Sequence, residues 1–453
     1  MKLVYNIKDK PNLPQLIVLA VQQLLAIMAA TLVVPVIIGN GMSPAAALLG
    51  AGVGTIVYLM FTKFRSPVFL GSSFAFLGSM AAAFAGASTV ALGYLGLILG
   101  AIFAGLIYVA ISFIVKYVGV AWINKLMPAV VIGPTVAIIG LSLASNAVSD
   151  LGTAPAGGHT LIAILCGLVT LATVIFCSVF GKKTMKLIPF IIGILAGYIV
   201  ALIFTIIGAI ANAPALMVIS FDSFKALVAD GVKFTTFLDI PKFTFVTALG
   251  GFESLDFSYI LTVFVAYAPV ALVVFAEHIA DHKNISSIIE KDLLEDPGLD
   301  KTLLGDGVGS MAGAFFGGCA NTTYGESVAC VAITGNASVL TIFTAAIGAI
   351  IISFLSPFVA FVNSIPSCVM GGVCMALYGF IAVSGLKMIQ KVDLEQNTNL
   401  FVVSVILISG IGGLTLTFGK VTVTSVACAL ILGILTNLFV SMKVDLDKIF
   451  KKK

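Results

Sequence analysis

Runs of about 20 consecutive apolar residues recur along almost the whole chain, and they limit the folds that it can adopt. A helix of ~20 apolar residues is long enough to cross the hydrocarbon core of a bilayer. Of the 453 residues, 60% are hydrophobic and 10% are charged, whereas soluble domains have about 45–50% apolar and about 25% charged residues. The sequence therefore predicts an all-α polytopic membrane protein and excludes a soluble globular domain.

Fourteen segments are predicted to be membrane spans. Residues 1–10 lack the order of basic residues, apolar core and cleavage site that a secretory signal peptide needs. The predicted spans are residues 14–39, 45–62, 69–86, 93–115, 126–146, 160–180, 187–211, 259–281, 302–317, 321–335, 338–361, 366–385, 397–418 and 421–442. An even number of spans places both termini on the same side of the membrane.

The basic residues indicate which side this is. When both termini are placed in the cytoplasm, twenty of the 24 Lys and Arg residues fall in cytoplasmic segments. The exceptions are Lys225, Lys233, Lys242 and Lys420. Because cytoplasmic loops are enriched in Lys and Arg, the sequence predicts cytoplasmic termini and supports the span count. The longest outside segment, about 212–258, divides the chain into two halves of seven spans.

Matching interruptions of the apolar runs predict that the two halves are copies. Residues 70–76 open the third span and residues 320–326 open the tenth, and both are small and polar with an aromatic residue. Pro128 and Pro366, each followed five residues later by glycine, open the fifth and twelfth spans. Since seven is odd, the second copy is inverted, as in many secondary transporters. Such interruptions line a cavity when they lie at membrane depth, so they predict a midplane binding site; the alternative is that they are ordinary loops.

Four carboxylates do not lie clearly in loops, and a carboxylate inside a span suggests a functional role. Glu277 and Asp281 lie four residues apart and share a helical face, while Glu326 follows the interruption of the tenth span. Asp306 is expected to be a helix-start or solvated residue at the cytoplasmic entrance of the ninth span. Asp281 has two interpretations: it shares a proton with Glu277, or it is solvated at a helix end beside His282.

Other functions have weaker support. His278 and His282 have the spacing of zinc ligands on a helix and, with Asp281, resemble an inverted metalloprotease motif, but no third ligand has useful spacing. The chain contains no Gly-x-Ser-x-Gly motif of a serine hydrolase and no Walker A motif of an ATPase. Composition alone does not distinguish a transporter from an ion channel. An inverted repeat with a single site favours a transporter that works by alternating access. We therefore expect no metal site, no catalytic residues and no enzyme.

Several stretches resemble the nucleobase–ascorbate transporter family, and within it the bacterial uracil permeases. They are residues 30–36, 70–76, 276–278, 291–299, 321–326 and 332–334. The run Asn-Thr-Thr-Tyr-Gly-Glu at 321–326 is the most specific, and the resemblance extends through essentially the entire chain.

The resemblance implies a fold of fourteen spans in a 7+7 inverted repeat, with short antiparallel β-strands interrupting spans three and ten. Spans one to four (residues 1–119) and eight to eleven (259–363) would form a core domain. Spans five to seven with the extracellular segment (120–258) and twelve to fourteen with the cytoplasmic tail (364–453) would form a gate domain.

The same resemblance implies a substrate site. Its expected residues are Phe74, Glu277, Tyr324, Gly325, Glu326 and Tyr378. The two glutamates would accept hydrogen bonds from the two ring N–H groups of uracil, and the backbone N–H groups of Phe74 and Gly325 would donate to its carbonyl groups. Tyr324 and Tyr378 would line the pocket, Tyr378 through water. Gly325 lets the backbone approach the base closely.

The chain departs from the family pattern at two positions. Gln22-Gln23 stands where the family commonly has Gln-His, and Asp281 stands where relatives can have a histidine four residues after the glutamate. Both departures concern proton handling, which we assign to Glu277 and Asp281.

We expect a proton-coupled symporter that imports uracil into a bacterium through its inner (plasma) membrane. The proton is the coupling ion, and no other cofactor and no nucleic-acid partner is expected. The resemblance also implies a homodimer formed by the gate domains. A xanthine or other purine carrier is the alternative, but Ala320 stands where purine carriers commonly have glutamine, which favours uracil.

Overall fold

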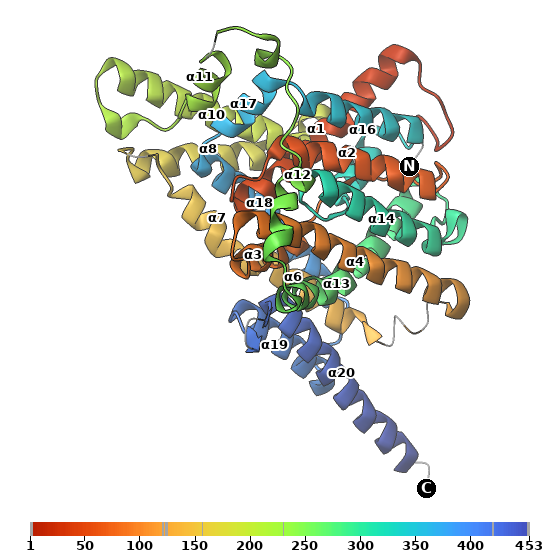
Figure 1. Ribbon diagram of the computed structural model, residues 1–453. Helices are drawn as coiled ribbons and strands as arrows, with labels where there is room; N and C mark the ends of the chain where they lie inside the picture. The colour runs from red at the N-terminus through yellow and green to blue at the C-terminus, as the bar shows by residue number, and fades with distance from the viewer. Residues whose placement is uncertain are drawn as a thin grey trace.

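The computed structural model describes residues 3–119, 122, 126–155, 157–229, 231–418 and 421–450, and helices make up most of it (Figure 1). Lys420, which the sequence places outside, lies beyond these residues. The first half of the chain contains α1 (Leu13–Ile38), α2 (Pro44–Phe61), β1 (Leu70–Ser72), η1 (Phe74–Phe76), α3 (Leu77–Ala85), α4 (Val90–Val118), α6 (Ala129–Ser142), α7 (Ala144–Leu151), α8 (Thr160–Val179), α9 (Lys183–Leu187) and α10 (Pro189–Ile210).

Short helices follow in the segment between the halves. They are η2 (Pro214–Leu216), α11 (Asp222–Val228), η3 (Phe234–Thr236), α12 (Thr244–Ala248) and η4 (Leu249–Ser254). The second half contains α13 (Phe257–Ile289), η5 (Leu294–Gly298), α14 (Leu299–Gly317), β2 (Asn321–Thr323), α15 (Gly325–Thr334), α16 (Val339–Ser353), α17 (Ser356–Ser364), α18 (Ser367–Ile389), α19 (Asn397–Ile411), β3 (Leu416–Phe418), β4 (Val421–Val423) and α20 (Ser425–Phe450).

Polar caps begin four of the long helices. The side chains of Asn12, Ser43, Thr89 and Asp256 each accept a hydrogen bond from the backbone N–H three residues later, at the starts of α1, α2, α4 and α13. Such caps satisfy N–H groups that have no partner inside the helix.

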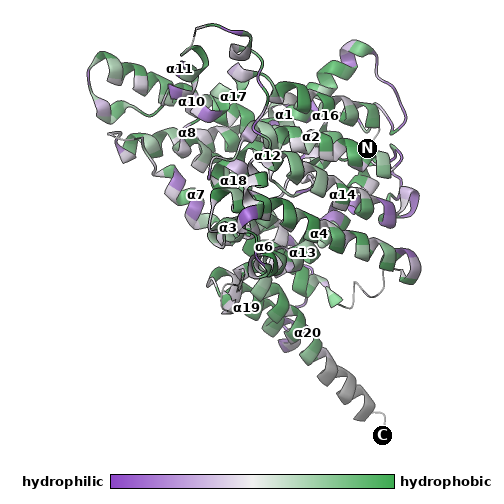
Figure 2. Ribbon diagram, in the orientation of Figure 1, coloured by the Kyte–Doolittle hydropathy of each residue, from purple (hydrophilic) through white to green (hydrophobic). Residues whose placement is uncertain are grey.

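The outer surface is apolar. Eight helices in the described part of the chain are long and apolar enough to cross a membrane, and five shorter apolar helices accompany them. Figure 2 shows hydrophobic residues along the helices and hydrophilic residues mostly at helix ends and in loops. Large apolar side chains such as Leu161, Ile210 and Phe401 are 67%, 78% and 61% exposed. This is the pattern of a multi-pass membrane protein whose outer faces contact lipid.

Packing divides the helices into two groups. In the first group α2 packs on α14 and α16, α4 packs on α13 and α14, and α1 packs on α16. In the second group α18 packs on α6, α7 and α8, α10 packs on α8, and α19 packs on α6 and α20. Glycine permits close crossings between helices: a Cβ on Gly54 of α2 would lie 2.6 Å from the backbone oxygen of Gly309 on α14.

Two three-residue strands join the halves at the centre of the first group. β1 and β2 are antiparallel, with Leu70 opposite Thr323, Gly71 opposite Thr322 and Ser72 opposite Asn321. The strands lie at the openings where the sequence predicts interruptions. η1 follows β1 and α15 follows β2 after one residue each, so both strands lead into helix N-termini.

Two sequence expectations about helix ends are wrong. α13 continues to Ile289, so Asp281 and His282 lie inside this helix and are buried, not solvated at its end. Asp306 lies about two turns inside α14 and is fully buried, not solvated at its start. His278 Nδ1 lies 2.7 Å from Asp306 Oδ2. Because His278 on α13 and Asp306 on α14 contact each other, both helices can continue through these polar residues. The length of an apolar run in the sequence does not reveal such a contact.

Candidate functional site

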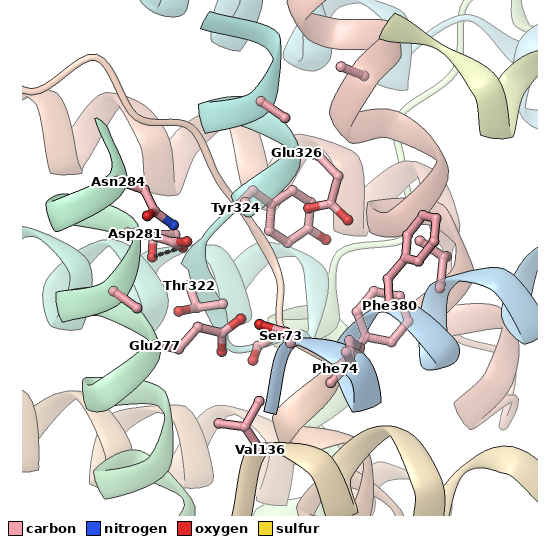
Figure 3. A pocket seen from close by; sticks show the side chains of 18 of the residues that line it. Ser73, Phe74, Val136, Glu277, Asp281, Asn284, Thr322, Tyr324, Glu326 and Phe380 are labelled. Carbon is pink, nitrogen blue, oxygen red and sulfur yellow. Dashed lines mark hydrogen bonds between the residues drawn. The ribbon is translucent and has the colours of Figure 1, made fainter. Parts of the chain in front are cut away.

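A cavity of about 460 Å³ lies between the two packing groups, where β1 and β2 end. One side is formed by α13, η1 and α15, and the opposite side by α6 and α18. Figure 3 shows carboxyl, hydroxyl and aromatic side chains converging on this space from segments that are far apart in the sequence.

The cavity brings together most of the predicted site. Its lining includes Phe74, Glu277, Asp281, Tyr324, Gly325 and Glu326. Tyr378 is the exception, because it does not line the cavity in this conformation. Its ring packs edge-on against Phe74, with ring centroids 6.0 Å apart, and its side chain is 2% exposed. Phe74 therefore stands between Tyr378 and the open space.

One face of α13 supplies the polar wall of the cavity. Glu277, Asp281 and Asn284 follow at intervals of four and three residues, which places them on one helical face. Thr323 Oγ1 donates a 2.8 Å hydrogen bond to Asp281 Oδ2, which ties this face to β2. Glu277 is half-buried and faces the cavity, whereas Asp281 is only 8% exposed.

Two helix N-termini point towards the same space. η1 begins at Phe74 and α15 begins at Gly325, and each has backbone N–H groups in its first turn without a partner inside the helix. Helix N-termini carry partial positive charge and favour electron-rich groups such as carbonyl oxygens. The site thus offers fixed donors from the two strand–helix junctions and fixed acceptors from Glu277 and Glu326.

Aromatic and apolar side chains complete the walls. Phe74 and Phe380 face the cavity, together with Val136 from α6 (Figure 3). The hydroxyl of Tyr324 donates a 2.8 Å hydrogen bond to the backbone oxygen of Ser72, so its ring is held against β1. Flat aromatic surfaces next to a few convergent polar groups suit a planar, polar small molecule.

A buried polar network lies on the far side of α13. His278 Nδ1 contacts Asp306 Oδ2 at 2.7 Å, and His278 Nε2 contacts Thr302 Oγ1 at 3.0 Å. His282 uses one ring nitrogen on the backbone oxygen of His278 and the other on the Tyr58 hydroxyl. All four ring nitrogens of the two histidines thus lie within hydrogen-bond distance of other groups, and the described residues include no group of three or more potential metal ligands.

Several site residues were missed by the sequence analysis. Ser73, Thr322 and Asn284 line the cavity, and Thr323 holds Asp281. Asn284 follows Glu277 at helical spacing, so that spacing was an available signal. The hydrogen bond from Thr323 to Asp281 depends on the packing of β2 beside α13, which the sequence does not show.

Comparisons with known proteins agree with this picture. Residues 14–419 match a family model described as Permease family. The chain is 37% identical to the uracil permease of Bacillus caldolyticus over 440 residues, which are 96% of this chain and 94% of that protein. It is 36% identical to the uracil permease of Escherichia coli (strain K12) over 433 residues, 95% and 92% of the two chains.

Two solved structures share the fold. The transmembrane domain of the cyanobacterial bicarbonate transporter BicA aligns with a TM-score of 0.62 and 16% identity, covering 95% of this chain and 99% of that one. The murine Solute Carrier 26 family member A9 anion transporter aligns with a TM-score of 0.66 and 11% identity, covering 96% and 69%. At such identities the likeness concerns the fold alone.

The sequence motifs, the paired strands and the near full-length match to permeases lead to one assignment. The chain belongs to the nucleobase–ascorbate transporter family of membrane permeases.

Proposed function

We propose that this protein is a proton-coupled symporter that imports uracil by alternating access. One observation carries the proposal: Glu277, Glu326 and the helix starts at Phe74 and Gly325 meet in a single cavity. The relatives named uracil permeases, aligned over nearly the whole chain, support the same substrate.

Two carboxylates and two helix starts in the cavity are complementary in kind to the polar groups of uracil. Carboxylates accept hydrogen bonds, and uracil offers two ring N–H donors; backbone N–H groups donate, and uracil offers two carbonyl acceptors. Glu277 on α13 and Glu326 in the first turn of α15 supply the acceptors. Phe74 and Phe380 supply aromatic surfaces for the ring. A larger purine with the same hydrogen-bonding edge is the second candidate.

The direction in which the cavity leads supports the proposal of alternating access. Besides the site, it is lined by Asn284 on α13, Lys186 on α9 and Met388 on α18. Under the orientation expected from the basic residues, these lie towards the cytoplasm, which supports our assignment of this conformation to an inward-open state. We propose that the first packing group is the core, the second is the gate, and the core moves against the gate within a fourteen-span fold. The cytoplasmic termini, the plasma membrane and a gate-mediated homodimer belong to the same proposal.

Coupling to protons is assigned to Glu277 and Asp281. Two carboxyl groups one helical turn apart repel each other when both are charged, and a bound proton relieves this repulsion. Glu277 and Asp281 both line the cavity, but Asp281 is more deeply buried and accepts a hydrogen bond from Thr323. A proton can therefore bind with the base and leave towards Asp281 and the cytoplasm.

Uptake of labelled uracil tests this function. In cells without their own uracil carriers, the protein should give saturable accumulation of chemically unchanged uracil, and a protonophore should abolish the accumulation. Competition by a panel of unlabelled bases ranks uracil against xanthine and other purines. Chemically altered uracil inside would indicate an enzyme, and non-saturable flux would indicate a channel. Accumulation that resists the protonophore would contradict proton coupling.

A further inference from the structure

Two hydroxyl groups in the cavity wall have no hydrogen-bond partner among the described residues. They are Ser73 Oγ and Thr322 Oγ1, whose side chains are 1% and 2% exposed. Both residues line the cavity. Leaving a buried hydroxyl without a partner is unfavourable, so these two groups require an explanation. We call them the hydroxyl pair.

Ser73 occupies a position where a serine normally serves a different purpose. It is the N-cap residue of η1, and an N-cap serine usually accepts a hydrogen bond from a backbone N–H of the first turn. Here the side chain makes no cap hydrogen bond. Its hydroxyl is left for the cavity, and the N–H groups at the start of η1 are left for a ligand.

The paired strands bring the hydroxyl pair together from the two halves of the chain. Ser73 N donates to the backbone oxygen of Ala320 at 2.9 Å, and Thr322 lies opposite Gly71. In the view of Figure 3 the carboxyl group of Glu277 is drawn between the side chains of Ser73 and Thr322, and neither hydroxyl forms a hydrogen bond with it in this conformation.

We propose that Ser73 and Thr322 are positioning residues for Glu277, whose carboxyl group they orient towards the bound substrate. This rests on the proposed function, because it assigns a second layer to the same nucleobase site. A carboxylate can accept several hydrogen bonds. When one oxygen of Glu277 accepts a ring N–H of the base, the hydroxyl pair donates to the remaining acceptor positions.

Hydroxyls suit this position because they both donate and accept. They can donate to the charged carboxylate and, after rotation, accept from the protonated carboxyl. A backbone N–H can only donate, so it could not accept the hydrogen bond that the protonated carboxyl offers. The hydroxyl pair therefore supports Glu277 in both protonation states that a proton-coupled cycle requires, while the charged form gains more from them.

Other ionisable groups also act on Glu277. Asp281 lies one turn away on α13, Glu326 faces the cavity from α15, and Asp306 lies behind α13 on α14. Lys186 of α9 lines the cavity farther away, and the lining residues from α6 are apolar. The substitutions proposed below leave all of these charges in place.

Ser73→Ala and Thr322→Val test the inference by removing each hydroxyl with little change in shape. Hydrogen bonds to charged groups are among the stronger ones in proteins. Each variant should therefore bind uracil about tenfold more weakly. The pH at which uptake is half-maximal should rise by about one unit, because loss of the donors disfavours the charged carboxylate. Thr322→Ser keeps the hydroxyl and should behave as the wild type in both measurements.

Ser72→Ala is the matched control, since Ser72 is equally buried one residue earlier but does not line the cavity. It should change neither binding nor the pH profile. Weaker binding without a shifted pH profile would overturn the inference, because the hydroxyls would then act on the base or on the strands. If Ser73→Ala does not fold, the comparison of Thr322→Val with Thr322→Ser still tests whether the hydroxyl of residue 322 supports Glu277. A wild-type protein that binds no nucleobase would instead refute the proposed function.

Discussion

Thr323 Oγ1 donates a 2.8 Å hydrogen bond to Oδ2 of Asp281, and so links β2 to α13 within the membrane protein's interior. The two residues are 42 positions apart in the chain. This bond holds a carboxyl group one helical turn from Glu277, next to the cavity but scarcely exposed. The position suits a group that handles the proton and leaves the base to Glu277.

Asp281→Asn should separate substrate binding from proton coupling. The amide keeps the shape and can still accept the Thr323 hydrogen bond, but it cannot take up the coupling proton. We expect uracil binding within about threefold of wild type, with loss of accumulation against a gradient and of its pH dependence. Proteoliposome uptake with and without a pH gradient measures this.

Asp292→Asn is the control for Asp281→Asn, because it makes the same chemical change on an exposed loop residue. It should transport as the wild type does. Gradient-driven accumulation by Asp281→Asn at the wild-type level between about pH 5 and pH 8 would remove Asp281 from the coupling step and leave Glu277 alone.

Glu326→Gln should weaken uracil binding at least about tenfold. The carboxylate only accepts hydrogen bonds, whereas the amide also donates, so one ring N–H of the base meets a donor in some rotamers. A mispaired buried polar group costs about 1–3 kcal/mol, and ~1.4 kcal/mol is tenfold. Equilibrium binding to purified protein measures the loss. Glu395→Gln, on an exposed loop, should bind normally; equal affinity in both variants would exclude Glu326 from the site.

Gly71→Ala should disturb the site through packing. A Cβ at Gly71 would lie 2.4 Å from ring atoms of Tyr324, whose hydroxyl is held by Ser72. Because this ring is buried, the ring or strand β1 must move, and overpacking of this kind costs about 1–3 kcal/mol. We expect a lower thermal midpoint in detergent and weaker uracil binding. Gly78→Ala is the control, since nothing lies within 4 Å of a Cβ there; equal behaviour of the two variants would contradict the packing argument.

Asp296 should show a pH-dependent contribution to stability. It accepts hydrogen bonds from Lys291 Nζ at 2.7 Å and Arg65 Nη1 at 2.6 Å. These contacts lower the pKa of Asp296 from 3.8 to about 2. Because the folded-state pKa is the lower one, the stabilisation is complete above about pH 4 and is lost as the pH falls through about 2.

Asp296→Asn should therefore lower the thermal midpoint slightly at about pH 7, and the difference from wild type should vanish as the pH falls from about 4 to about 2. The effect is small because the partners are well exposed, and added salt should reduce it further. Asp292→Asn, which lacks the two basic partners, should show no such pH dependence. A difference that persists at about pH 2 would rule out the ionic origin.

Cysteine labelling should test the orientation. All seven native cysteines are buried, so the background labelling is low. Val232→Cys, at a 71% exposed position in the segment between the halves, should react in intact cells with a membrane-impermeant thiol reagent. Glu395→Cys, exposed between α18 and α19, should react only after the membrane is opened. The reverse pattern would place the termini outside.

The sequence by itself determined the class of protein, the approximate positions of most helices and the places where two apolar runs are interrupted. Long apolar runs can be satisfied only by helices in a bilayer, because each backbone polar group then pairs within its own segment. The small polar runs at 70–76 and 320–326 indicated where the helices would be interrupted, and β1 and β2 lie there. Glu277 and Glu326 were visible because carboxylates stand out in apolar sequence.

Tertiary structure alone decided which polar groups meet. The burial of Asp306 depends on its contact with His278 of the neighbouring helix α13. The environment of Asp281 depends on Thr323 of β2, a strand that η5 and α14 separate from α13 in the chain. Tyr378 of α18 is kept from the cavity by its edge-on contact with the ring of Phe74 of η1. The local sequence contains the helical periodicity and the N-cap residues. A hydrogen bond between distant segments forms only once helix packing has brought both partners together.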